Sequence, residues 1–191
     1  LFGVNAKISS IDFKRVISRA SGIVDKDAKE IEEAIIEDKN TTLFKTEAKF
    51  ISDRTLKAKN ETIKGEKVII AAGTRASIPP IEGLIDLDYM TSTEALRLIK
   101  QPKTLTVIGG GYIAAELAHF FCALGTKVYV IQRREVLIPS EDYEIAKKFT
   151  DIFRKKCKVL LNTNAVKAAK KGKKFITTAK AGANADLTNS R

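Results

Sequence analysis

Three small residues at a fixed spacing suggest the clearest chemistry in this chain. Gly109, Gly111 and Ala114 match the pattern G-x-G-x-x-G/A and directly follow the apolar run 105–108. In this pattern the first glycine allows a tight turn out of a strand, the second leaves room for a pyrophosphate, and the last small residue lets a helix pack closely on the sheet. The N–H groups and the positive dipole end of that helix would face the phosphates. The spacing therefore predicts a dinucleotide phosphate site.

The segments on both sides of the glycines give the context that this pattern requires. The run 105–108 suits a strand buried on both faces, Gly125 ends the predicted helix, and residues 127–131 supply a second strand. The predicted inward face of the helix is Ala114, Leu117, Ala118 and Phe121. The alternative is a glycine turn in an ordinary α/β domain without a ligand, and the complete strand–turn–helix–strand order favours the binding site.

The end of the second strand is where such sites distinguish NAD from NADP. An acidic residue there accepts the ribose 2′-OH of NAD, whereas arginine accepts the 2′-phosphate of NADP. This chain has Gln132, Arg133 and Arg134 at that point. The missing acid and the two cations favour NADP, but Glu135 offsets them in part, and the arginines can also be interpreted as solvated loop charges. The choice between NAD and NADP stays open.

Length and composition restrict the other functions. With 191 residues, the chain can hold one full domain and part of another. The 34 Lys and Arg residues exceed the 23 Asp and Glu residues and give a net charge of +11, but they are scattered rather than interleaved with aromatic residues, so we expect no nucleic-acid partner. We expect no membrane span, signal peptide or metal site, a cytoplasmic location, and reduced, structural Cys122 and Cys157.

Residues 1–97 predict a helix followed by strands. Apolar residues at helical spacing indicate one long amphipathic helix over residues 11–38. Short antiparallel strands are expected over 42–50, 55–58 and 61–63. An apolar strand over 67–71 then ends in Ala72, Gly73 and Thr74, a second place where backbone could approach a ligand.

The remaining elements surround the glycine motif. Thr91 and Glu94 have the spacing of a capping box and open a helix over 93–100. Ser140 is the predicted N-cap of a further helix. A third parallel strand is expected over 158–161, an antiparallel pair over 166–169 and 174–179, and no structure is assigned to 181–191. The predicted inner face of the helix after Ser140 is Ile145, Phe149, Ile152 and Phe153.

The order of these parts resembles the pyridine nucleotide-disulfide oxidoreductases, the flavoprotein family of dihydrolipoamide dehydrogenase, glutathione reductase, mycothione reductase and mercuric reductase. The match covers about residues 2–179, and its most specific segments are 47–50, 68–75, 78–83 and 107–116. The resemblance implies an α/β fold: a Rossmann-like parallel sheet with a small antiparallel addition, plus a partial FAD-domain segment made of a helix and antiparallel strands. It places that segment in residues 1–97 and the NAD(P)-binding domain in residues 98–191.

The resemblance also implies a function. Such enzymes move hydride between NAD(P)H, FAD and a disulfide or dithiol, and we lean towards the dihydrolipoamide or mycothione reductase branch. This chain would supply the NAD(P)-binding portion of an enzyme that is homodimeric when intact. One alternative is a non-catalytic NAD(H)-sensing module, which would have no need for Ala72, Gly73 and Thr74 or for Ala48. Another is a structural remnant that has lost all binding.

Family roles carry over to matching positions. In such enzymes Ala48 would contact the FAD adenine, and Ala72, Gly73 and Thr74 would lie against the flavin nucleotide. Gly109, Gly111, Ile113 and Ala114 would line the NAD(P) pyrophosphate turn. Tyr112 would cover the flavin until nicotinamide displaces it, and Glu116 would lie near the flavin–nicotinamide junction; helix-start packing and a solvated charge are the alternatives for these two. Arg133 matches an arginine of NADP users, Gln132 falls where NAD users keep their acid, and Pro139 stands where some NADP users have a second arginine.

Several family features have no counterpart in this sequence. The glycine-rich FAD strand and helix, the Cys-x4-Cys redox pair and the His-Glu acid–base pair do not occur. The single histidine, His119, falls on the helix after the glycines, where we expect surface or packing. We therefore predict no catalytic residue in this chain, and by itself it is not expected to complete the reaction.

Overall fold

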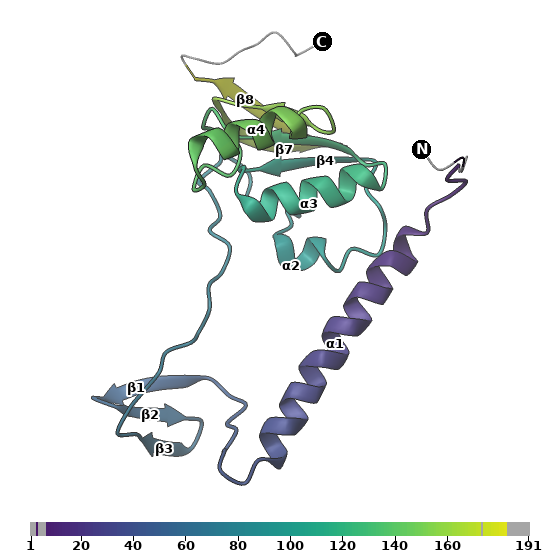
Figure 1. Cartoon of the computed structure of the whole chain (residues 1–191). Helices are drawn as coiled ribbons and strands as arrows, with labels where there is room; N and C mark the ends of the chain where they lie inside the picture. The colour runs from purple at the N-terminus through teal and green to yellow at the C-terminus, as the bar shows by residue number, and fades with distance from the viewer. Residues whose placement is uncertain (1–2, 4–6, 173, 183–191) are drawn as a thin grey trace. The chain divides into compact units, whose positions relative to one another are not determined.

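The computed structural model describes residue 3, residues 7–172 and residues 174–182 (Figure 1). Backbone contacts divide the chain into two compact units. The first unit consists of Leu1–Arg19 and Ser77–Arg191, and the second is Ala20–Ala76. The assignment of residues 1–97 and 98–191 to two cofactor domains of the family stays a prediction.

A three-stranded parallel sheet forms the centre of the first unit. Its strands are β4 (Thr104–Ile108), β5 (Lys127–Ile131) and β6 (Lys158–Leu160), in the order β4-β5-β6. Helix α3 (Tyr112–Ala123) connects β4 to β5, and α4 (Tyr143–Phe153) connects β5 to β6. Parallel neighbours require such crossover helices, so this order confirms the predicted Rossmann-like α/β arrangement.

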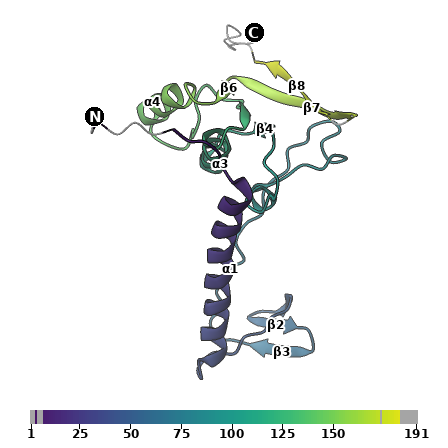
Figure 2. The ribbon, with the colours of Figure 1, turned by 90° about the vertical axis from the view of Figure 1, so that its right-hand side faces the viewer.

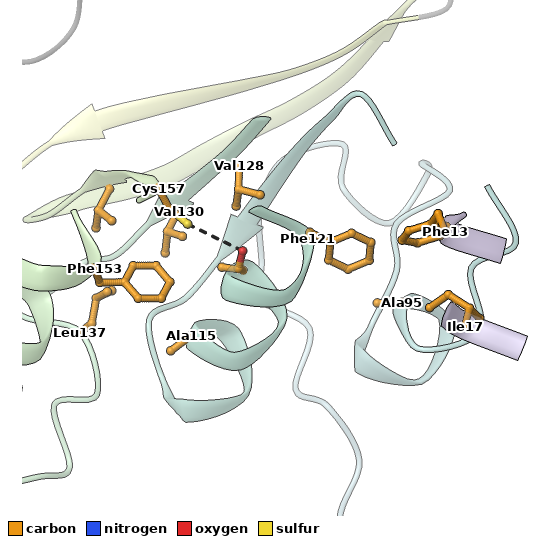
Figure 3. Close-up of a cluster of buried hydrophobic side chains, with 12 residues drawn as sticks. Phe13, Ile17, Ala95, Ala115, Phe121, Val128, Val130, Leu137, Phe153 and Cys157 are labelled. Atoms are coloured by element: carbon orange, nitrogen blue, oxygen red, sulfur yellow. Dashed lines mark hydrogen bonds between the residues drawn. The ribbon is translucent and has the colours of Figure 1, made fainter. Parts of the chain in front are cut away.

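The core of the first unit lies between this sheet and α3. Val128 and Val130 alternate along β5 and belong to one buried cluster with Ala118 and Phe121, whose side chains are fully buried. Figure 3 shows the two valines and Phe121 in this cluster. The predicted inward face of α3 is correct for Ala118 and Phe121. Ala115 is buried in place of Ala114, and Leu117 is only half-buried. The buried stripe is thus rotated slightly from the predicted one.

Two predictions for α4 are wrong. The N-cap is Asp142 rather than Ser140, because Asp142 Oδ1 accepts hydrogen bonds from the N–H groups of Glu144 (3.0 Å) and Ile145 (3.2 Å). The buried face is Ala146, Thr150 and Phe153, so the predicted inner face is correct only for Phe153. Ile145 and Ile152 are exposed, and Phe149 is half-buried.

The reason for the rotated face of α4 is a polar contact. Thr150 Oγ1 accepts a hydrogen bond from the N–H of Leu137 (2.9 Å) and donates to the carbonyl of Ala146 (2.7 Å). Small residues on this face let α4 approach the chain around Leu137, which is itself fully buried. The larger isoleucines are left at the edges of the helix.

Two further helices pack in the first unit near α3. Helix α1 (Phe13–Glu37) begins in this unit, where Phe13 and Ile17 are buried (Figure 3). The Phe13 ring lies 6.0 Å from that of Phe121 and 6.2 Å from that of Phe120. Helix α2 (Ser92–Ala95) shows the predicted capping box but covers four residues instead of 93–100. Leu98, which follows the helix, packs against the core.

A long antiparallel hairpin follows β6. Its strands are β7 (Thr163–Lys171) and β8 (Lys174–Ala181), which confirms the predicted antiparallel addition and extends it. In both views β7 lies on the opposite side of β4 from α3 (Figures 1 and 2). Ala168 of β7 packs with Ile81 and Leu84 in a small second core. Gly83, at φ +73°, fits there because a Cβ would lie 2.5 Å from the Ala168 carbonyl oxygen.

The second unit holds the rest of α1 and a small sheet. Strands β1 (Ala48–Ser52), β2 (Thr55–Ala58) and β3 (Glu61–Lys64) pair antiparallel in chain order, so the first begins later than predicted. The predicted strand over 67–71 is wrong: the chain there is a loop in which Ile69 is 90% exposed and Ile70 74% exposed. A strand buried on both faces needs neighbours on its edges, and no described strand lies beside this segment.

None of the helices that the structure describes combines the length and the apolar character that a membrane crossing requires.

Candidate dinucleotide-binding site

The glycine turn between β4 and α3 has the geometry of an anion site. Gly109 adopts φ +107°, which favours glycine, and its N–H donates to the Ile131 carbonyl at 2.9 Å. Gly111 is the N-cap of α3, and a Cβ built there would meet no atom within 4 Å. No side chain of the described residues caps the helix. The first-turn N–H groups of α3 therefore have no side-chain cap, and a phosphate could accept their hydrogen bonds.

The middle glycine of the turn has a packing role that the sequence pattern did not reveal. Gly110 is buried, and a Cβ there would lie 2.8 Å from both Gln132 Nε2 and Leu137 Cδ2. Its carbonyl accepts a hydrogen bond from the N–H of Ile138 at 2.6 Å. Gly110 thus holds the turn against the segment that follows β5. The sequence did contain one signal of this role: Gly110 is a third consecutive glycine, at a position where the motif accepts any residue.

Gln132, the predicted cofactor-selecting position, lies under this turn. Its side chain is only 5% exposed, and Nε2 donates to the Val136 carbonyl at 3.1 Å. The backbone of Gln132 continues the sheet, because its N–H donates to the Leu160 carbonyl at 2.8 Å. Arg133 and Arg134 are both exposed. All three residues therefore follow the end of β5, with Gln132 buried against Gly110 and the two arginines exposed.

The first turns of α3 present the other predicted contacts. Tyr112 is 66% exposed and Ile113 46% exposed, Glu116 is exposed, and Ala114 is half-buried. One side of α3 forms, with α4, an open groove of about 440 Å³. Tyr112, Glu116, His119, Phe149 and Ile152 are among its lining residues. His119 is exposed on this wall, so it stands on the helix surface.

The residues predicted to contact flavin lie in the second unit. Ala48 is the exposed first residue of β1 and pairs with Ala58. Ala72, Gly73 and Thr74 are exposed in the loop that follows β3, and Gly73 adopts φ +66° with open space around a Cβ position. Each of these positions is accessible, but the structure does not enclose them in a common pocket. Their roles towards FAD stay predictions from the resemblance.

A family model described as pyridine nucleotide-disulphide oxidoreductase matches residues 5–188. The chain belongs to this family. Mercuric reductase from Staphylococcus aureus is 37% identical over 144 residues, which is 75% of this chain and 26% of that protein. Mycothione reductase from Mycobacterium tuberculosis is 32% identical over 177 residues, 90% of this chain and 39% of that protein. The family resemblance inferred from the sequence is thus confirmed.

A solved structure supports the same fold. The HOCl-induced flavoprotein disulfide reductase RclA from Escherichia coli matches with a TM-score of 0.77 at 27% identity, and the match covers 90% of this chain and 42% of that one. The chain therefore spans between about a quarter and two fifths of these relatives. It corresponds to a fragment of enzymes that reduce several different substrates.

Proposed function

We propose that this chain is the NAD(P)-binding portion of a flavin-dependent disulfide oxidoreductase. The observation that carries the proposal is the open glycine turn: Gly109 at positive φ, Gly111 without a neighbour at its Cβ position, and the uncapped start of α3. A Cβ at Gly111 would fill the space that a pyrophosphate needs. Membership of the family supports the same interpretation.

The residues of this chain would hold and orient the nicotinamide cofactor. The N–H groups at the start of α3 would donate to the pyrophosphate, and Ala114 would keep the helix close to β4. When bound, the cofactor supplies hydride for transfer to FAD and a disulfide in the intact enzyme. We propose FAD contacts at Ala48 and at Ala72, Gly73 and Thr74 from the family resemblance alone.

The choice between NAD and NADP would depend on the tip of β5. Arg133 and Arg134 are exposed there, whereas Gln132 is turned under the glycines. A 2′-phosphate could therefore reach a guanidinium group. Position 132 carries no acidic side chain that could accept a hydrogen bond from a ribose 2′-OH. This arrangement favours NADP.

The substrate is proposed only as a class, a disulfide or dithiol in the intact enzyme. The relatives carry different names, mercuric reductase and mycothione reductase among them, so the family does not select one substrate. A dihydrolipoamide dehydrogenase-like role, a homodimeric intact enzyme and a cytoplasmic location are further proposals that rest on the resemblance and on composition.

Calorimetric titration of the chain with NADH and NADPH tests the proposal, with Gly111→Val as the decisive variant. We expect saturable binding of the wild type, tighter for NADPH, and at least a tenfold loss in Gly111→Val. The valine has space in the fold itself, so circular dichroism should show a native spectrum. Gly22→Ala, on α1 and equally free of neighbours, is the matched control and should bind like wild type. Unchanged affinity in Gly111→Val would rule out the phosphate turn.

A further inference from the structure

The two cysteines of the chain come together although they belong to different elements. Cys122 lies in the last turn of α3, and Cys157 immediately precedes β6. Cys122 Sγ donates to the Lys156 carbonyl at 2.9 Å, and Cys157 Sγ points to the Ala118 carbonyl at 3.7 Å (Figure 3). Each thiol thus contacts backbone that adjoins the other cysteine, since Lys156 precedes Cys157 and Ala118 lies one helical turn before Cys122.

These contacts place the two cysteines next to each other. A carbonyl oxygen lies about 3 Å from the next Cα in a trans peptide, so Cys122 Sγ is within roughly 6 Å of the Cys157 Cα. The Cys157 thiol also interacts directly with the Cys122 side chain, so the two thiol groups adjoin each other. Rotation of the two side chains about χ1 could therefore bring the sulfur atoms together without separating α3 from β6.

The two thiols differ in burial. Cys157 is 4% exposed and belongs to the main core, whereas Cys122 is half-buried. Burial, the largest cause, and the interaction with the Cys122 side chain together raise the pKa of the Cys157 thiol to about 12, although the nearby Lys156 cation lowers it. A small oxidant from solution would therefore meet Cys122 first, with Cys157 held beside it as a thiol.

We propose that Cys122 and Cys157 are an oxidation site that closes to an intramolecular disulfide. With hydrogen peroxide as oxidant, the Cys122 sulfur loses two electrons and becomes a sulfenic acid, and one water is released. The Cys157 sulfur then attacks the Cys122 sulfur, and the thiol proton leaves with the hydroxyl group as a second water. Two thiols and one peroxide thus give one disulfide and two waters.

The bond would connect the end of α3 to the start of β6 and enclose β5 and α4 in a covalent loop. Closing a loop of this length restricts the unfolded chain and stabilises the folded one. The glycine turn lies at the opposite end of α3, so nucleotide binding should persist in the oxidised chain. The oxidation site is therefore independent of the proposed function.

Mass spectrometry of the full chain tests the site. The native wild type is treated with hydrogen peroxide, alkylated and mapped without reduction. We expect a monomer that has lost two hydrogen atoms, takes up no alkylating reagent, contains a linked pair of peptides from positions 122 and 157, and reverts with dithiothreitol. Its melting temperature should rise by about 5 °C or more.

Variants identify the order of events. Cys157→Ser should leave a sulfenic acid at Cys122 that dimedone traps, and Cys122→Ser should leave Cys157 unmodified in the folded chain. Because Cys157→Ser places a hydroxyl in the core, the mapping of the wild type decides the question even if that variant fails to fold. Three results would each overturn the proposal. They are disulfide-linked dimers, addition of oxygen atoms without a disulfide between positions 122 and 157, and two thiols that still react with the alkylating reagent.

Discussion

Gly110 shows how a single hydrogen atom can decide the packing of the glycine turn. A Cβ at this position would lie 2.8 Å from Gln132 Nε2 and Leu137 Cδ2. Both side chains are buried, and Gln132 is held by its hydrogen bond to Val136, so neither can move aside easily. We expect Gly110→Ala to lower the free energy of unfolding by about 1–3 kcal/mol, measured by denaturant titration.

The neighbouring Gly111 provides the control. Gly111→Ser places its Cβ in open space and puts a favourable N-cap residue before α3, so its stability should equal or slightly exceed that of the wild type. Equal losses in both variants would show that the turn is generally intolerant of side chains and would contradict the packing role of Gly110.

Gln132 allows a second test at this scale. Gln132→Glu replaces a buried N–H donor by a carboxylate oxygen that would face the Val136 carbonyl. We expect a loss of about 1–3 kcal/mol in unfolding free energy at neutral pH. Arg133→Gln, at an exposed position, should change stability by less than about 0.5 kcal/mol. Wild-type stability in Gln132→Glu would show that the side chain can turn out to solvent, where an acid could bind ribose.

These residues also show what the sequence could predict at this scale. The roles of Gly109 and Gly111 followed from spacing, because backbone geometry alone restricts those positions. The burial of Gln132 and the need for glycine at position 110 depend on each other through a tertiary contact. The glycine motif accepts any residue at position 110, because the restriction there comes only from the neighbouring side chains in the fold.

At the scale of elements, the start of α1 is fixed by one aromatic side chain. Phe13 is 6% exposed, and its ring packs on Phe120 and Phe121 of α3. Phe13→Ala should lower the unfolding free energy of the first unit by about 3–5 kcal/mol, as measured by thermal or denaturant unfolding. Ile23→Ala on the same helix is the control: Ile23 is 57% exposed, so a change below about 0.5 kcal/mol is expected. Similar losses of unfolding free energy in the two variants would contradict the packing of α1, in which Phe13 is buried and Ile23 is exposed.

The capping box of α2 gives a prediction for pH. The Thr91 hydroxyl, and then the Thr91 N–H, hold the pKa of the Glu94 carboxyl below its ordinary value. A lowered pKa means that the ionised cap stabilises α2 above the usual carboxyl range and that this stabilisation is lost as pH falls through the lowered pKa. An NMR titration should find the Glu94 midpoint below that of a free glutamate, and Thr91→Val should raise it. An unchanged midpoint in Thr91→Val would contradict the capping box.

The elements differ in how well the sequence predicted them. The positions of the parallel strands and of α3 came out close to those expected because their apolar runs and glycines specify them locally, but β4 is wrongly predicted as buried on both faces: its residues alternate between exposed and half-buried. The buried face of α4 did not, because Thr150 bonds to Leu137 and replaces a larger apolar residue in the core. The strand expected over 67–71 has the right composition, but a strand forms only where another strand can accept its hydrogen bonds.

At the scale of the whole molecule, apolar burial is distributed very unequally between the two units. The main core, with Phe121, Val130 and Leu137 at its centre, belongs to the first unit. Within residues 20–76, all of which the structure describes, Ala58 is the only buried apolar side chain. The sequence indicated this contrast only in that residues 11–38 predicted a long amphipathic helix, whose apolar face needs a surface to pack against.

This inequality predicts that the two units open separately. Burial of apolar area is the main stabilising contribution in a domain, and a three-stranded sheet without a covered face is marginal in water. Hydrogen exchange should therefore show fast-exchanging amides in β1, β2 and β3 and strongly protected ones in β4 and β5. In Phe13→Ala the protection of β4 and β5 should fall while that of β1 to β3 stays unchanged, because Phe13 packs only within the first unit. Uniform protection across all strands in the wild type would contradict this prediction. It would mean that residues 20–76 bury more apolar surface than the structure shows.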